Sequence, residues 1–176
     1  MSRVPVVMRR VLYALAPAAI VYIWFFGWGL LINFVIAAAA GLLTEGAILR
    51  LRGRGTRYVL NDGSALVTAA LLSFALPSLV PFWIPAVGTM VAIALAKQIF
   101  GGLGKNPFNP AMAGYVFLLL SFPVQMTHWT PPRMGDLDYQ YLSFAGSLNY
   151  AITGRLPPDV EVDALTRATP LDLVKE

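Results

Sequence analysis

Residues 28–49 read WGLLINFVIAAAAGLLTEGAIL, and Glu45 is the one charged side chain among them. A helix needs roughly 20 mostly apolar residues to cross a hydrocarbon core of about 30 Å. This stretch reaches that length, so it predicts a membrane-spanning helix. The rest of the chain is then expected to lie in or beside a lipid bilayer.

The composition agrees with a membrane protein. The 176 residues are 57% hydrophobic and 12% charged, whereas an ordinary soluble domain is about 45–50% apolar and about 25% charged. The chain has no cysteine, and His128 is its single histidine. A cysteine-ligated iron–sulfur cluster, a thiolate zinc site and a disulfide are therefore excluded on this chain, and we expect no metal site. A redox role would need an organic cofactor or a metal on a partner.

Apolar segments follow one another along residues 1–126, which we interpret as the transmembrane part of an all-α integral membrane protein. Pro77 and Pro81 interrupt the third segment, so we expect a short or broken helix there. Asp62 and Asn109 are expected to cap the third and fifth segments through their side chains. The five expected segments cover about residues 11–26, 28–49, 63–80, 82–100 and 110–126.

Residues 127–176 differ in character, and we interpret them as an extracytoplasmic tail. They are rich in proline, acidic residues and tyrosine, and the weakly amphipathic stretch YLSFAGSLNYAI (141–152) suits a membrane surface.

The basic residues predict the orientation of the chain. Nine of the thirteen Lys and Arg residues fall in regions that share one side of the membrane if all five segments cross, and the positive-inside rule makes that side cytoplasmic. The tail, with seven of the nine acidic residues, is then outside. No small-residue cleavage site closes the first segment, so we expect it to be retained as a helix. The nine basic residues are Arg3, Arg9, Arg10, Arg50, Arg52, Arg54, Arg57, Lys97 and Lys105.

Two acidic residues are candidates for an ion path. A carboxylate at membrane depth is costly and indicates a function by default, which applies to Glu45 and secondarily to Asp62. Glu45 could instead reach water or pair with Arg50. Lys97 is interpreted as a charge that snorkels to the interface and sets orientation, and His128 as a solvated or hydrogen-bonded interfacial side chain.

The loop GGLGKNPFNP (101–110) contains glycines that could let backbone N–H groups approach an anion. It lacks the GxxxxGK[ST] order of a nucleotide-binding loop. We therefore favour a tight turn between helices over a phosphate cradle.

Two long stretches carry a family resemblance. NDGSALVTAALLSFALP (61–77) and PFWIPAVGTMVAIALAKQIFGGLGKNPFNPAMAGYVFLLLSFP (81–123) resemble the first helical repeat of the RnfD/NqrB family, with NPFNPAM as the most specific part. The resemblance covers about residues 42–175. That family has about ten helices in two repeats, so it implies that this chain is an N-terminal half whose helices form one repeat of a urea-transporter-like fold.

The resemblance extends to a flavin-attachment pattern in the tail. DALTRAT (163–169) is similar to the family pattern D-x-x-[S/T]-x-A-T. By this resemblance Thr169 would carry FMN through a phosphoester, and Asp163, Thr166 and Ala168 would be recognised by a flavin transferase outside the cytoplasm. A threonine hydroxyl is a weak nucleophile without an activating base, so a separate enzyme is expected to make the bond.

The resemblance implies a subunit of a redox-driven, ion-translocating electron-transport complex in the bacterial cytoplasmic membrane. Such a chain would not turn over alone. Its expected partners are the other membrane subunits, a second-half chain or another copy of itself, the flavin transferase and the lipid bilayer. A second flavin or a quinone shared with partners is also expected. We expect no nucleic-acid partner, because the basic residues set membrane orientation.

Two other functions remain open from the sequence. A shortened paralogue could be a flavin-free structural subunit of a respiratory or photosynthetic membrane complex, since Arg167 stands where the family often has a small residue. Half of a channel or transporter is suggested by fold analogy alone, which is a weak argument for function. Sodium and protons remain equally open as the transported ion.

Overall fold

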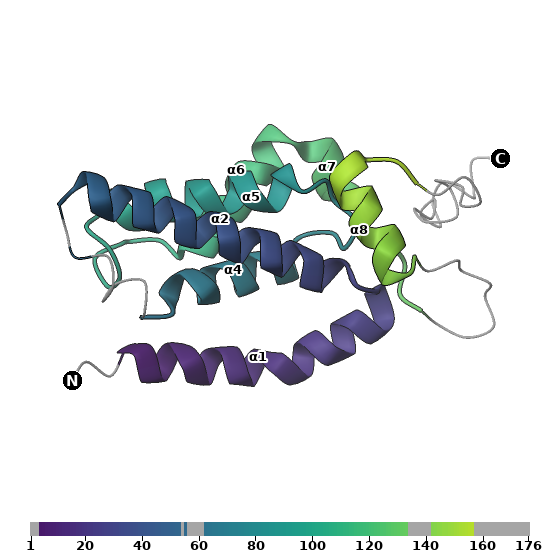
Figure 1. Ribbon diagram of the computed structural model, residues 1–176, viewed down its shortest axis with the longest axis horizontal. Helices are drawn as coiled ribbons and strands as arrows, with labels where there is room; N and C mark the ends of the chain where they lie inside the picture. Colours follow the sequence, from purple (N-terminus) through teal and green to yellow (C-terminus); the bar gives the residue numbers. More distant parts are fainter. Residues whose placement is uncertain (1–3, 54, 56–61, 134–141, 157–176) are drawn as a thin grey trace.

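The computed structural model describes residues 4–53, 55, 62–133 and 142–156, and every regular element among them is a helix. This confirms the helical class. The helices pack side by side, with the shorter α7 and α8 at one end (Figure 1). In chain order they are α1 (Val4–Phe26), α2 (Gly29–Leu51), α4 (Ser64–Ala75), α5 (Trp83–Val91), η1 (Ala92–Gln98), α6 (Pro110–Ser121), α7 (Pro123–Thr127) and α8 (Phe144–Thr153).

Helices α1 and α2 are the two described helices with the length and apolar composition to cross a membrane. Each has 23 residues, which at 1.5 Å per residue makes about 34 Å. Gly27, with a φ of 80°, makes the turn between them. Helix α1 begins at Val4, earlier than the expected start near residue 11, so Arg9 and Arg10 lie within the helix.

The third expected segment is confirmed as short and broken. Helix α4 ends at Ala75 instead of continuing to Val80, because Pro77 disfavours helical backbone at the residue before it. Asp62 Oδ1 accepts a hydrogen bond from the Ser64 backbone N–H at 2.7 Å, which is the expected cap.

Neighbouring helices cover the non-helical backbone after α4. Asn33 Nδ2 on α2 donates to the Pro77 carbonyl at 3.1 Å, and a Cβ at Gly29 would lie 1.7 Å from the Ser78 carbonyl oxygen. The Ser78 and Thr130 hydroxyls share a hydrogen bond of 2.5 Å. Irregular backbone is tolerated at membrane depth only where protein covers it, and these contacts supply that cover.

The fourth and fifth segments are also modified by their local sequence. The fourth runs from α5 directly into the π-helix η1. The fifth begins at Pro110, where the Asn109 side chain accepts from the Ala111 N–H as expected. It is interrupted at Phe122, where the backbone leaves helical geometry before Pro123 begins α7.

The apolar core lies between α4, α5 and α6, while α1 contributes no buried residue. Helices α5 and α6 approach closely, since a Cβ at Gly114 would lie 2.6 Å from the Gly88 carbonyl oxygen. Large apolar side chains face outward, as at Tyr13, Leu43 and Leu120, which are between 73% and 78% exposed. Such apolar surface suits contact with lipid or a partner.

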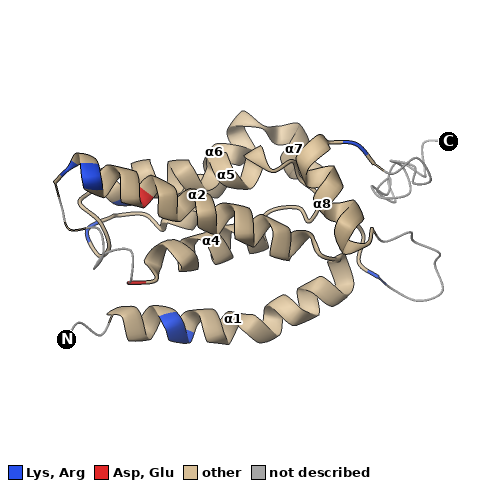
Figure 2. Cartoon of the chain, in the orientation of Figure 1, with Lys and Arg blue, Asp and Glu red and all other residues tan. Residues whose placement is uncertain are grey.

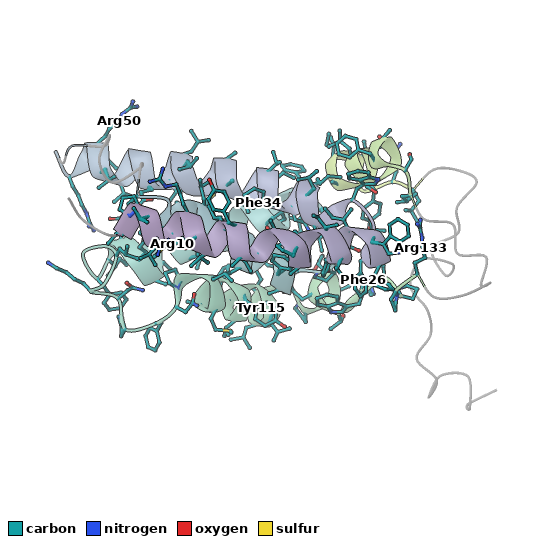
Figure 3. All side chains as sticks on the ribbon, turned by 90° about the horizontal axis from the view of Figure 1, so that it is seen from below. Arg10, Phe26, Phe34, Arg50, Tyr115 and Arg133 are labelled. Atoms are coloured by element: carbon teal, nitrogen blue, oxygen red, sulfur yellow. The ribbon has the colours of Figure 1, made fainter. Side chains whose placement is uncertain are left out.

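Most charged residues lie toward the two ends of the bundle (Figure 2). Arg10 and Arg50 lie toward one end, which we call the basic end, and Arg133 lies beside Phe26 at the other, the far end (Figure 3). The middle of the bundle is left apolar, as a membrane requires. Arg3, Arg54 and Arg57 lie outside the described residues. Assignment of this arrangement to a urea-transporter-like repeat stays a prediction.

Candidate functional site

The most polar site in the described chain centres on Glu45, near the basic end of α2. The Glu45 side chain is completely buried, and its Oε1 lies 2.5 Å from Lys97 Nζ in an ion pair. Lys97 is itself only 1% exposed. Desolvating two charges is costly unless they pair closely and accept or donate further hydrogen bonds. The hydrogen bonds that neighbouring side chains make to this pair therefore matter for its stability and its chemistry.

The π-helix η1 brings two neighbouring side chains to the same carboxylate oxygen. Gln98 Nε2 donates to Glu45 Oε1 at 2.7 Å, beside the bond from Lys97. In an α-helix, consecutive side chains point about 100° apart, so both would not ordinarily reach one atom. Here the two long side chains, both on the π-helix η1, converge on Glu45 Oε1, and such π-turns occur frequently at functional sites.

The ion pair is linked to the start of α4. Lys97 Nζ also donates to Ser64 Oγ at 2.6 Å, and the Ser64 hydroxyl donates in turn to Asp62 Oδ1 at 2.5 Å. Ser64 is buried and Asp62 is half-buried. The two acidic candidates of the sequence are therefore joined through Ser64 and Lys97.

One atom of the site has no hydrogen-bond partner among the described residues, namely Glu45 Oε2. A buried, unsatisfied carboxylate oxygen is expensive and calls for a functional explanation. Arg52 closes the basic end of the site, because its Nη1 donates to the Gln98 carbonyl at 2.7 Å.

The structure corrects two interpretations made from the sequence. Lys97 does not snorkel to the interface; it is buried and paired with Glu45. Glu45 reaches neither water nor Arg50, whose side chain is exposed. Sequence reasoning also missed Ser64 and Gln98. The available signal was Lys97 followed by Gln98 at the end of an otherwise apolar run from residue 81.

A separate apolar pocket of about 270 Å³ lies between α1, α2 and α4. It contains no charged side chain, so it suits an apolar group such as a lipid chain and not an ion. Its lining residues are Leu12, Leu15, Ala16, Ala19, Ile23, Leu30, Leu31, Phe34, Ala70, Ser73 and Phe74.

The flavin-attachment residues Asp163, Thr166, Ala168 and Thr169 lie outside the described residues. Within the described ranges, no group of three or more His, Cys, Asp or Glu side chains could hold a metal ion. His128 is exposed just after α7.

Curated relatives match this chain over nearly its whole length. The RnfD protein of the ion-translocating oxidoreductase complex of Colwellia psychrerythraea is 46% identical over 181 residues, which cover 99% of this chain and 51% of that protein. The RnfD proteins of Shigella dysenteriae serotype 1 and Escherichia coli strain SMS-3-5 are 42% and 41% identical, each over 96% of this chain and 49% of the relative. The chain thus spans about half the length of these relatives.

The family profile described as NQR2, RnfD, RnfE matches residues 1–176. This is the family that the helical segments and the tail pattern resemble. The chain belongs to the NQR2, RnfD, RnfE family.

Proposed function

We propose that this chain is a membrane subunit of a redox-driven ion-translocating complex and carries covalent FMN on Thr169. The observation that supports this most directly is the match to RnfD relatives, which are named as parts of an ion-translocating oxidoreductase complex. The attachment pattern at residues 163–169 adds an independent local signal. Because these relatives are named as subunits of a complex, the chain is proposed to act with the other membrane subunits.

The side chains of the tail have the chemistry that covalent attachment of FMN needs. The Thr169 hydroxyl can form a phosphoester, and Asp163, Thr166 and Ala168 would be read by the flavin transferase. When bound, the flavin would supply one- and two-electron redox chemistry, while the protein supplies position and electrostatics.

The proposed orientation places the basic end in the cytoplasm of a bacterium and the tail on the extracytoplasmic side of its inner membrane. Two features of the described residues support it. Arg10 and Arg50 lie at the basic end (Figure 3), and α8, after which the tail continues, lies at the far end (Figure 1). Thr169 would then be accessible to a transferase that works outside the cytoplasm.

We further propose that the ion path of the complex includes Glu45 and Asp62. Charged side chains within membrane segments are rare and mark ion or proton pathways. The complete burial of Glu45 and its link to the half-buried Asp62 support this role.

In-gel flavin fluorescence tests the covalent cofactor. The wild-type protein from its native membrane, denatured and separated by electrophoresis, should give a fluorescent band, and Thr169→Val should abolish it. Thr153→Val is the matched control, because Thr153 is an exposed threonine on α8 outside the attachment pattern. Its band should persist, with protein amounts equalised by immunoblot.

A wild-type protein without a band, in cells whose flavin transferase is shown to be active, would contradict the FMN proposal. The better account would then be a flavin-free structural subunit. Arg167 favours that second candidate, because a long charged side chain lies inside the pattern that the transferase must recognise.

A further inference from the structure

An uninterrupted series of hydrogen bonds runs from the edge of the bundle into its interior. It begins at the half-buried Asp62, passes through the Ser64 hydroxyl and the Lys97 ammonium, and ends at the buried Glu45. The three bonds measure 2.5, 2.6 and 2.5 Å. Three different helical regions contribute, so the series exists only in the folded chain.

The direction of each hydrogen bond shows how a proton can pass along the series. Lys97 Nζ donates to both Ser64 Oγ and Glu45 Oε1, and Ser64 Oγ donates onward to Asp62 Oδ1. A hydroxyl that accepts one hydrogen bond and donates another can accept a proton on one side and release its own on the other. Ser64 is placed to do this between a cation and a carboxylate.

We propose that Asp62, Ser64, Lys97 and Glu45 form a proton relay between the basic end of the bundle and its interior. The proposal rests on the proposed ion-translocating function and specifies the ion that this chain handles. Glu45 Oε2, buried and unpartnered among the described residues, is the inner terminus of the relay.

The site favours a proton over a metal cation. Ca²⁺ and Mg²⁺ take several oxygen ligands, whereas Glu45 and Asp62 are the only two acidic residues in the described ranges. The Lys97 ammonium already occupies the position beside Glu45 Oε1 that a metal cation would take. Gln98 donates to the same oxygen, and Arg52 adds a further positive charge nearby through the Gln98 carbonyl.

The relay transfers protons only, and no residue is oxidised or reduced. The Lys97 ammonium gives a proton to Ser64 Oγ as the Ser64 proton passes to the Asp62 carboxylate. A protonated Glu45 then returns a proton to the neutral Lys97 amine. The net result is one proton moved from Glu45 to Asp62, and the reverse order carries a proton inward.

Ser64→Ala and Asp62→Asn interrupt the relay while keeping the cap at the start of α4. Alanine removes the bridging hydroxyl but keeps the backbone N–H that Asp62 caps, and asparagine keeps a capping oxygen but cannot accept the proton. Ser64→Thr restores a hydroxyl. Ser73→Ala is the matched control, because Ser73 is a buried serine on the same helix whose hydroxyl bonds the Ala69 carbonyl.

The assembled complex is tested in inverted membrane vesicles that are supplied with an electron donor and an electron acceptor that the wild-type complex turns over. Proton uptake is followed with a pH-sensitive dye in sodium-depleted buffer containing potassium and valinomycin, and electron transfer is measured in the same vesicles with a protonophore. Ser64→Ala and Asp62→Asn should lower the number of protons moved per electron well below the wild-type value. Uncoupled electron transfer should stay near the wild-type rate, and Ser64→Thr and Ser73→Ala should retain proton uptake.

Other outcomes overturn the relay. Full proton uptake in Ser64→Ala, or a parallel loss of uncoupled electron transfer, would show that the hydroxyl is dispensable or purely structural. A wild-type complex that takes up only radioactive sodium would overturn the relay and leave the proposed ion-translocating function standing. A wild-type complex that transfers electrons and moves neither ion would overturn both.

Discussion

Glu45 and Lys97 carry opposite charges in a part of the molecule that is closed to water. A pair of this kind adds little net stability, since desolvation offsets most of the attraction, but the loss of one partner leaves the other charge buried and unpaired. Gln98 and Ser64 add hydrogen bonds that make the pair tolerable. At the scale of residues, the site is thus sensitive to single substitutions.

We expect Lys97→Met to lower the free energy of unfolding by about 3–5 kcal/mol, because it leaves the Glu45 carboxylate without its counter-charge. The double variant Glu45→Gln with Lys97→Met should recover most of that loss, since both charges are then removed. Unfolding of the purified protein in detergent measures the complete double-mutant cycle.

Lys105→Met is the control for this cycle, because Lys105 is an exposed lysine in the loop before α6. It should leave stability close to wild type. Equal effects of Lys97→Met in the presence and absence of Glu45 would contradict the coupling of the two residues.

At the scale of elements, the backbone after α4 packs against the start of α2. Gly29 lies so close to the Ser78 carbonyl that a side chain has no room, and Asn33 one turn later bonds the Pro77 carbonyl. Small residues let backbones approach closely in membrane proteins, and the amide of Asn33 satisfies a carbonyl that α4 leaves free. The two helices therefore stabilise the break together.

Gly29→Ala should separate α2 from the break, because the added Cβ would meet the Ser78 carbonyl at 1.7 Å. Overpacking of this kind typically costs about 1–3 kcal/mol. The expected result is a lower unfolding midpoint in detergent. Gly55→Ala is the matched control, since a Cβ there meets nothing within 4 Å. A Gly29→Ala protein as stable as Gly55→Ala would show that the close contact is absent.

At the scale of the whole molecule, most charged residues lie toward the two ends and few lie in the middle (Figure 2). The main exception within the apolar segments, the Glu45–Lys97 pair, is neutral overall and enclosed by protein. The arrangement suits a bilayer, and the orientation proposed from the positive-inside rule has the basic end in the cytoplasm.

The absence of cysteine from the chain makes this orientation testable by labelling. Thr153→Cys, exposed at the end of α8, should react with a membrane-impermeant maleimide in intact spheroplasts. Gly55→Cys, exposed just beyond α2, should react only after the membrane is opened. The cysteine-free wild type gives the background, and the opposite labelling pattern would reverse the proposed topology.

Local sequence by itself determined the helical class, the caps at Asp62 and Asn109, and the break before Pro77. Each depends on residues within a few positions of one another, where apolar run length, proline and side-chain caps act directly. The same reasoning identified Glu45 and Asp62 as the acidic candidates, and the family from its motifs.

Only the tertiary structure decided how those residues are used. Glu45 and Lys97 are 52 positions apart, and the spacing of residues within either segment gives no information about which helices pack together. Lys97 and Gln98 on η1 meet Glu45 on α2, and Ser64 on α4 links Lys97 to Asp62. These contacts form only when the three elements pack together. Burial then forces the lysine to pair with the carboxylate, because neither charge can reach water.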